Sequence, residues 1–207
     1  MERVKKIFGE YKISWKKLIL LAVIVAVITA VMLIIPFLEN TSFQDIGVYL
    51  DWWFVFAVFI IINCDKWYEA SLKCFVFFLI SQPLIYLLQV PFSHLGIHIF
   101  MYYKTWFIFT LLTLPGAAVA FLVKKKNWYS ALVLMVPIYY YANMAVSYIA
   151  MAIRHFPHHL LSGILAVVFA GIFIFGILEE KKHKQFEVIF FIIVLAACIA
   201  VPSLRLA

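Results

Sequence analysis

Residues 18–37 read LILLAVIVAVITAVMLIIPF, and this stretch decides the fold class. Thr29 is its only polar side chain. A helix of about 20 apolar residues, rising about 1.5 Å per residue, crosses the roughly 30 Å hydrocarbon core of a bilayer. The run is too long for a signal peptide, and no small-residue cleavage site follows it, so we predict a retained membrane anchor.

The rest of the chain continues this composition. Of its 207 residues, 67% are hydrophobic and 13% are charged, whereas a soluble domain carries about 25% charged residues. Backbone amides in hydrocarbon must be satisfied within the protein, which favours helices over open strands. We therefore predict an all-α, polytopic transmembrane bundle forming one domain over 18–207. About seven spans are expected, at 18–37, 47–64, 74–90, 105–123, 128–149, 160–178 and 186–204.

The positive charges indicate how the chain threads the bilayer. Fourteen of the 17 Lys and Arg residues fall in four segments on one side of this map, at 1–17, 65–73, 124–127 and 179–185. Such a bias across short loops marks the cytoplasmic side. We therefore predict a cytoplasmic N-terminus, an outer C-terminus and a location in a bacterial-type plasma membrane. The bias also explains the net charge of +7, so no nucleic-acid partner is expected.

Residues 1–17 form a basic segment of their own. Val4, Ile7, Phe8, Tyr11 and Trp15 recur at helical spacing beside six basic residues. This pattern predicts either an amphipathic helix on the anionic inner leaflet or a loose basic tail that only sets orientation.

Polar side chains recur on single faces of three predicted spans. Amides are costly in hydrocarbon unless they meet a partner, so these faces should meet protein or water. One interpretation is hydrogen bonding between helices; the other is an outward-opening cavity that binds a small molecule, ion or lipid. The candidate ligand-binding residues are Gln82, Tyr86, Gln89, Thr110, Tyr140, Asn143, Ser147 and Arg154.

Five of the six histidines are predicted at the outer surface. Imidazoles at i, i+4 spacing, joined by a second loop, are a pattern that can bind a transition metal. The alternatives are ordinary interfacial histidines, or roles in proton or lipid-headgroup binding. The candidate metal ligands are His94, His98, His155, His158 and His159.

Ala22, Ala26 and Ala30 form a stripe of small residues on the first span. Small residues let helix backbones approach closely in lipid. The stripe predicts either packing within the chain or a docking face for a partner membrane subunit.

Three functional hypotheses follow. The leading one is a binding or transport component with an outward cavity; the second is a membrane metalloenzyme using the outer histidines; the third is an accessory subunit. The sequence lacks HExxH, GxSxG, P-loop and glycine-rich dinucleotide motifs, so we predict no catalytic residues.

Overall fold

The computed structural model describes residues 11–125 and 127–201, and every regular element within them is a helix. Six helices are long and apolar enough to cross a membrane. They are α2 (Trp15–Ile34), α5 (Trp67–Gln89), α6 (Phe100–Ala120), α7 (Trp128–Arg154), α8 (Leu160–Gly171) with its π-helical continuation η4 (Ile172–Ile177), and α9 (Lys181–Ala200). Short 3-10 turns lie at η1 (Pro36–Leu38), η2 (Gly96–Ile99) and η3 (Phe121–Lys124). The predicted all-α membrane bundle is confirmed.

The span predicted at 47–64 is interrupted. The chain instead forms α3 (Ser42–Val48), an extended turn at Tyr49, and α4 (Asp51–Ile62). Twelve residues make a helix of about 18 Å, which is shorter than the hydrocarbon core. The predicted count of about seven spans thus becomes six long helices and one half-length helix among the described residues.

The N-terminal prediction is tested only in part. Residues 1–10 of the basic segment lie outside the described residues, and Tyr11–Ser14 is not helical. α2 begins at Trp15, where the hydroxyl oxygen of Ser14 accepts a hydrogen bond from the amide of Lys17 at 3.4 Å. Such a cap satisfies one of the free amides at a helix start.

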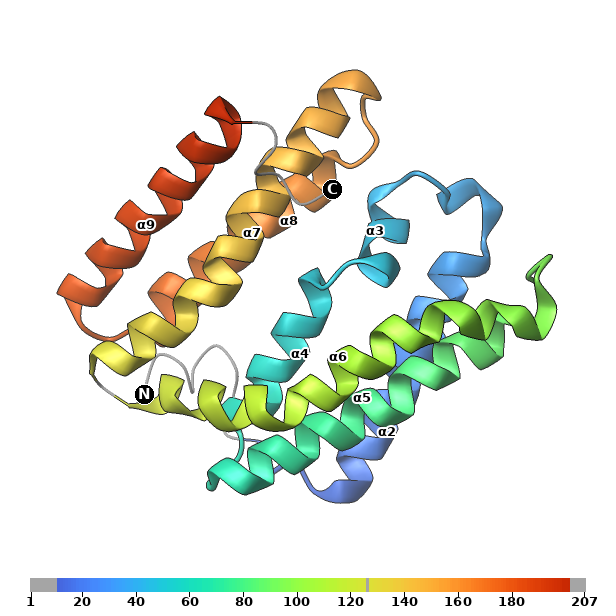
Figure 1. Cartoon of the computed structure of the whole chain (residues 1–207), viewed down its shortest axis with the longest axis horizontal. Coiled ribbons are helices and arrows are strands. Elements are labelled where there is room, and N and C mark those ends of the chain that lie inside the picture. Colours follow the sequence, from blue (N-terminus) through green and yellow to red (C-terminus); the bar gives the residue numbers. More distant parts are fainter. Residues whose placement is uncertain (1–10, 126, 202–207) are drawn as a thin grey trace.

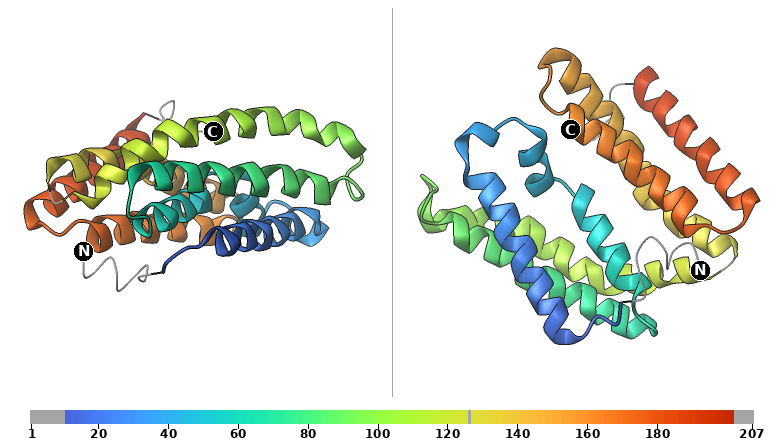
Figure 2. Two further views of the ribbon diagram at one scale, coloured as in Figure 1. Left: turned by 90° about the horizontal axis from the view of Figure 1, so that it is seen from below. Right: turned by 180° about the vertical axis from the view of Figure 1, so that it is seen from behind.

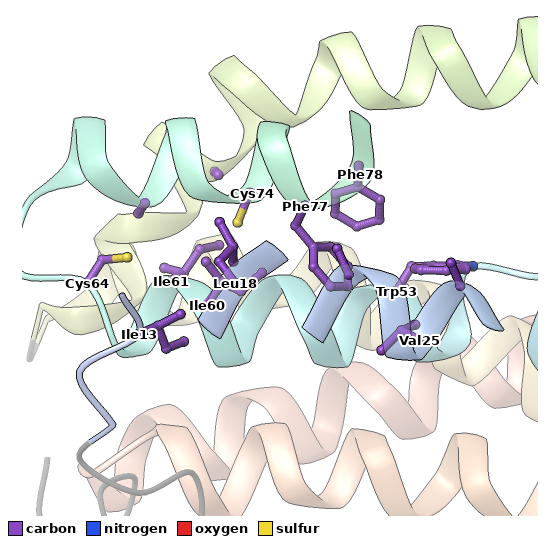
Figure 3. Packing of buried hydrophobic residues seen from close by; sticks show 14 of the residues in the cluster. Ile13, Leu18, Val25, Trp53, Ile60, Ile61, Cys64, Cys74, Phe77 and Phe78 are labelled. Carbon is purple, nitrogen blue, oxygen red and sulfur yellow. The ribbon is translucent and has the colours of Figure 1, made fainter. Parts of the chain in front are cut away.

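The long helices form two groups of three with α4 between them. Helices α2, α5 and α6 pack together, as do α7, α8 and α9 (Figures 1 and 2). α4 joins the two hydrophobic cores through adjacent side chains. Trp53 packs on Phe78 in the first group with ring centroids 5.7 Å apart (Figure 3), and Trp52 packs on Phe169 in the second at 5.2 Å. α4 is therefore a wedge that belongs to both groups.

The small-residue stripe of α2 is used inside the chain. Ala22, Ala26 and Ala30 are at most 1% exposed, and they belong to the core shared with α5. The stripe therefore serves packing within the chain, the first of the two predicted alternatives, and these residues offer no exposed surface to a partner subunit.

The basic loops meet at one end of the bundle. The amide of Tyr11 donates to Asn63 Oδ1 at 2.9 Å, and the Lys124 ammonium donates to the carbonyl of Cys64. The rings of Trp128 and His183 lie 4.4 Å apart. The Lys73 ammonium also donates to the carbonyl of Ile13. These contacts join the described parts of the four segments predicted to be cytoplasmic, or residues next to them, and we call this the basic end.

Candidate functional site

The break between α3 and α4 exposes backbone groups that tyrosines of α7 satisfy. The amide of Leu50 donates to the hydroxyl oxygen of Tyr140 at 2.9 Å. The hydroxyl of Tyr141 donates to the backbone carbonyl of Asp51 at 2.7 Å. Non-helical backbone at membrane depth is tolerated where protein groups replace the missing helical bonds. The tyrosine row of α7 therefore stabilises the interruption.

Asp51 occupies the first turn of α4 and is only 6% exposed. The hydroxyl of Tyr148 donates to its Oδ2 at 2.7 Å. Its other oxygen, Oδ1, is buried with no hydrogen-bond partner among the described residues. The partial positive charge at the start of α4 favours a carboxylate at this position, but one acceptor is left open.

A second buried carboxylate, Asp45 on α3, is fully engaged. Its Oδ2 accepts from the Ser162 hydroxyl at 2.6 Å and lies 2.9 Å from His159 Nδ1, which is also 3.2 Å from Oδ1. The Ser162 amide donates to the hydroxyl oxygen of Ser42 at 3.1 Å. A carboxylate only accepts, so Nδ1 carries the hydrogen whenever Asp45 is ionised. This cluster fastens α3 to the start of α8.

The two carboxylates share an aromatic wall. The rings of Tyr148 and His159 are stacked, with centroids 6.5 Å apart and planes inclined by 7°. Tyr49 meets Tyr148 edge-on at 5.7 Å. His159 is held in the left-handed region at φ 64°, where histidine occurs more often than most residues. Tyr148 thus connects Asp51 to the Asp45 cluster.

The predicted polar stripes fall in different helix groups. Tyr140 lies at the α3–α4 break, and Asn143 and Ser147 are buried on the same face of α7. Gln82, Tyr86, Gln89 and Thr110 belong to α5 and α6 in the other group, and Arg154 is exposed at the end of α7.

Of the four predicted ligand-binding residues in the group of α2, α5 and α6, three already have partners within that group. Tyr86 packs against Phe100 and Tyr103. The Gln89 amide donates to the Ile85 carbonyl and the Thr110 hydroxyl to the Trp106 carbonyl, each one turn earlier in its helix. Gln82 Nε2 is buried and has no hydrogen-bond partner among the described residues.

The predicted metal ligands are dispersed. His94, His98, His155 and His158 are exposed, whereas His159 pairs with Asp45. Across residues 11–125 and 127–201, no three His, Cys, Asp or Glu side chains are grouped closely enough to hold a metal. The transition-metal site stays a prediction that rests on sequence alone.

Sequence reasoning missed Asp45, Asp51, Tyr141, Tyr148 and Ser162 as site residues. Asp51 at the edge of an apolar run reads as an interfacial residue, and Ser162 reads as a small packing residue. The sequence did contain one signal for this site: Tyr141 and Tyr148 are seven residues apart and therefore share a helix face.

No protein-family model matches this chain, and neither a curated protein nor a solved structure is detectably similar to it.

Proposed function

We propose that this multi-pass membrane protein binds a small monovalent cation at Asp51 and serves as a binding or transport component for it. The proposal rests on the buried Oδ1 of Asp51, which has no hydrogen-bond partner in the part of the chain that the structure describes. An ionisable residue at membrane depth is expensive and marks an ion or substrate path more often than a packing contact.

Charge and geometry support a monovalent cation. A buried carboxylate without a countercharge is costly, and a cation or a proton at the open oxygen removes that cost. The nearby hydroxyls of Tyr140 and Tyr148 are hard neutral oxygens that can share a cation without adding negative charge. Interrupted membrane helices supply such ion sites in transporters.

The Asp45 cluster supports the site without competing for the ligand. Both Asp45 oxygens already meet His159, and Oδ2 also meets Ser162. We assign Asp45 the task of positioning α3, and Asp51 the task of binding. Of the predicted ligand residues, Tyr140, Asn143 and Ser147 are retained as the α7 wall of this site.

The test is cation-dependent thermal stability of the full-length protein in detergent. Sodium, potassium and methylammonium chloride are compared with N-methylglucamine chloride at constant ionic strength. We expect at least one of the first three to raise Tm in a saturable way, because a ligand that binds only the folded state stabilises it. Asp51→Asn should abolish this increment.

Asp45→Asn is the matched control. It weakens the contact between α3 and α8, so its Tm should fall while the cation-dependent increment persists. A wild-type Tm that is the same in all four salts, or an increment that survives in Asp51→Asn, would refute the proposal.

A further inference from the structure

A second buried acid lies on α9, away from the Asp51 site. Glu187 is 0% exposed, and neither of its carboxyl oxygens has a hydrogen-bond partner among the described residues. It lies six residues after the start of α9 at Lys181, which is about 9 Å along the helix axis. α9 packs against α7, so Glu187 is enclosed within the protein.

No neighbouring side chain among the described residues donates a hydrogen bond to Glu187. The ionisable side chains of α7 are tyrosines and Arg154. Tyr141 and Tyr148 form hydrogen bonds with Asp51. The hydroxyl of Tyr140 bonds to the amide of Leu50. The other ionisable side chains, Tyr129, Tyr139 and Arg154, are exposed. η4 has no ionisable residue, and the acids Glu179 and Glu180 follow it. On α9 itself, His183 and Lys184 lie within the preceding turn.

Glu180, His183 and Glu187 form a row that leads inward from the basic end. Their spacing of i, i+3 and i+7 places them on one helix face. Glu180 is 40% exposed, and its Oε2 lies 3.7 Å from Nε2 of His183, which is buried. His183 packs against the ring of Trp128. Acid and histidine chains of this kind carry protons in membrane proteins.

We propose that Glu187 is a proton-binding site, loaded from the basic end through Glu180 and His183. An ionised carboxylate without donors would cost several kcal/mol in such surroundings, so the carboxyl group holds its proton in this conformation. Proton release then requires a rearrangement that admits water or a base to Glu187. This inference does not depend on cation binding at Asp51.

The first measurement is infrared spectroscopy of the full-length protein in lipid at neutral pH. The carbonyl-stretch band of a protonated carboxylic acid should be present and should disappear in Glu187→Gln. It should persist in Glu180→Gln, the matched control on the same face. Glutamine closely matches the shape of the neutral acid, so the variant should keep the wild-type Tm. Absence of a protonated band assignable to Glu187 would overturn the proposal.

The second measurement is exchange of the Glu187 proton after transfer to deuterated buffer, followed by the shift of that band. His183→Leu should slow the exchange several-fold relative to wild type, and Gln185→Leu, altered at an exposed residue of the same helix, should leave it unchanged. Equal rates in all three proteins would refute the path through His183. Asp51→Asn should retain the Glu187 band. The infrared band therefore tests the Glu187 site alone, and the cation-dependent Tm tests the Asp51 site alone.

Discussion

At the scale of single residues, the site is defined by which polar atoms have partners. Tyr140 and Tyr141 bond to backbone groups of the α3–α4 break, and Tyr148 bonds to a side chain within it. Two of these hydroxyls thus satisfy backbone groups at the break, and the third holds the Asp51 side chain. The interruption and the tyrosine row therefore form one structural unit.

Removing the Tyr148 hydroxyl tests this unit. Tyr148→Phe leaves the ring in place but removes the donor to Asp51 Oδ2, so we expect a loss of about 1.5–3 kcal/mol of unfolding free energy. Tyr139→Phe, at an exposed position on the same helix, should change stability by less than about 0.5 kcal/mol. Denaturant titration in mixed micelles measures both, and equal stabilities would contradict the assigned bond.

At the scale of helices, α7 and α8 approach each other through Gly163. A Cβ on Gly163 would lie 3.1 Å from Cγ1 of Ile149 and 3.5 Å from its backbone nitrogen. Small residues at such crossings allow the close packing on which helix association in lipid depends. This crossing also positions the start of α8, including Ser162 and its bond to Asp45.

Enlarging Gly163 should separate the two helices. Gly163→Val adds branched bulk against Ile149, for which we expect a cost of about 1–3 kcal/mol. A Cβ on Gly171 would have no neighbouring atom within 4 Å. Gly171→Ala should therefore be neutral or stabilising by up to about 1 kcal/mol. Thermal unfolding of both variants is the measurement, and a Gly163→Val protein as stable as wild type would disprove tight packing there.

At the scale of the whole molecule, different sets of contacts hold the two ends of the helix bundle together. The described basic loops meet at one end, and the α3–α8 contact through Asp45 and His159 lies at the other. The positive-inside rule predicts that the basic end faces the cytoplasm. Under this prediction, the Asp51 site lies toward the outer side of the membrane and the Glu187 path starts from the cytoplasmic side.

Cysteine labelling in intact cells tests this orientation. The native Cys64, Cys74 and Cys198 are buried, so their background reaction with a membrane-impermeant maleimide should be low. His94→Cys should be labelled in intact cells, whereas Lys182→Cys should be labelled only after permeabilisation. The reverse pattern would place the N-terminus outside and exchange the sides assigned to the two sites.

Hydropathy located six of the spans to within several residues, because each is a long apolar run whose backbone must be helical in lipid. It failed at 47–64, where the residues are equally apolar but the helix breaks. The break depends on hydroxyls from residues some 90 positions away, and no local pattern contains that information. The candidate site could be predicted only in fragments, such as Tyr140 and His159, for the same reason.

The membrane class, the helical content and the segregation of positive charge were all readable in the amino-acid order, since each depends on composition or spacing along one segment. Folding in three dimensions decided the rest: that Ala22, Ala26 and Ala30 pack inward, that Asp45 is saturated, and that Asp51 and Glu187 retain open oxygens. Whether a buried polar atom has a partner depends on which distant helices surround it, and only the packed structure specifies those neighbours.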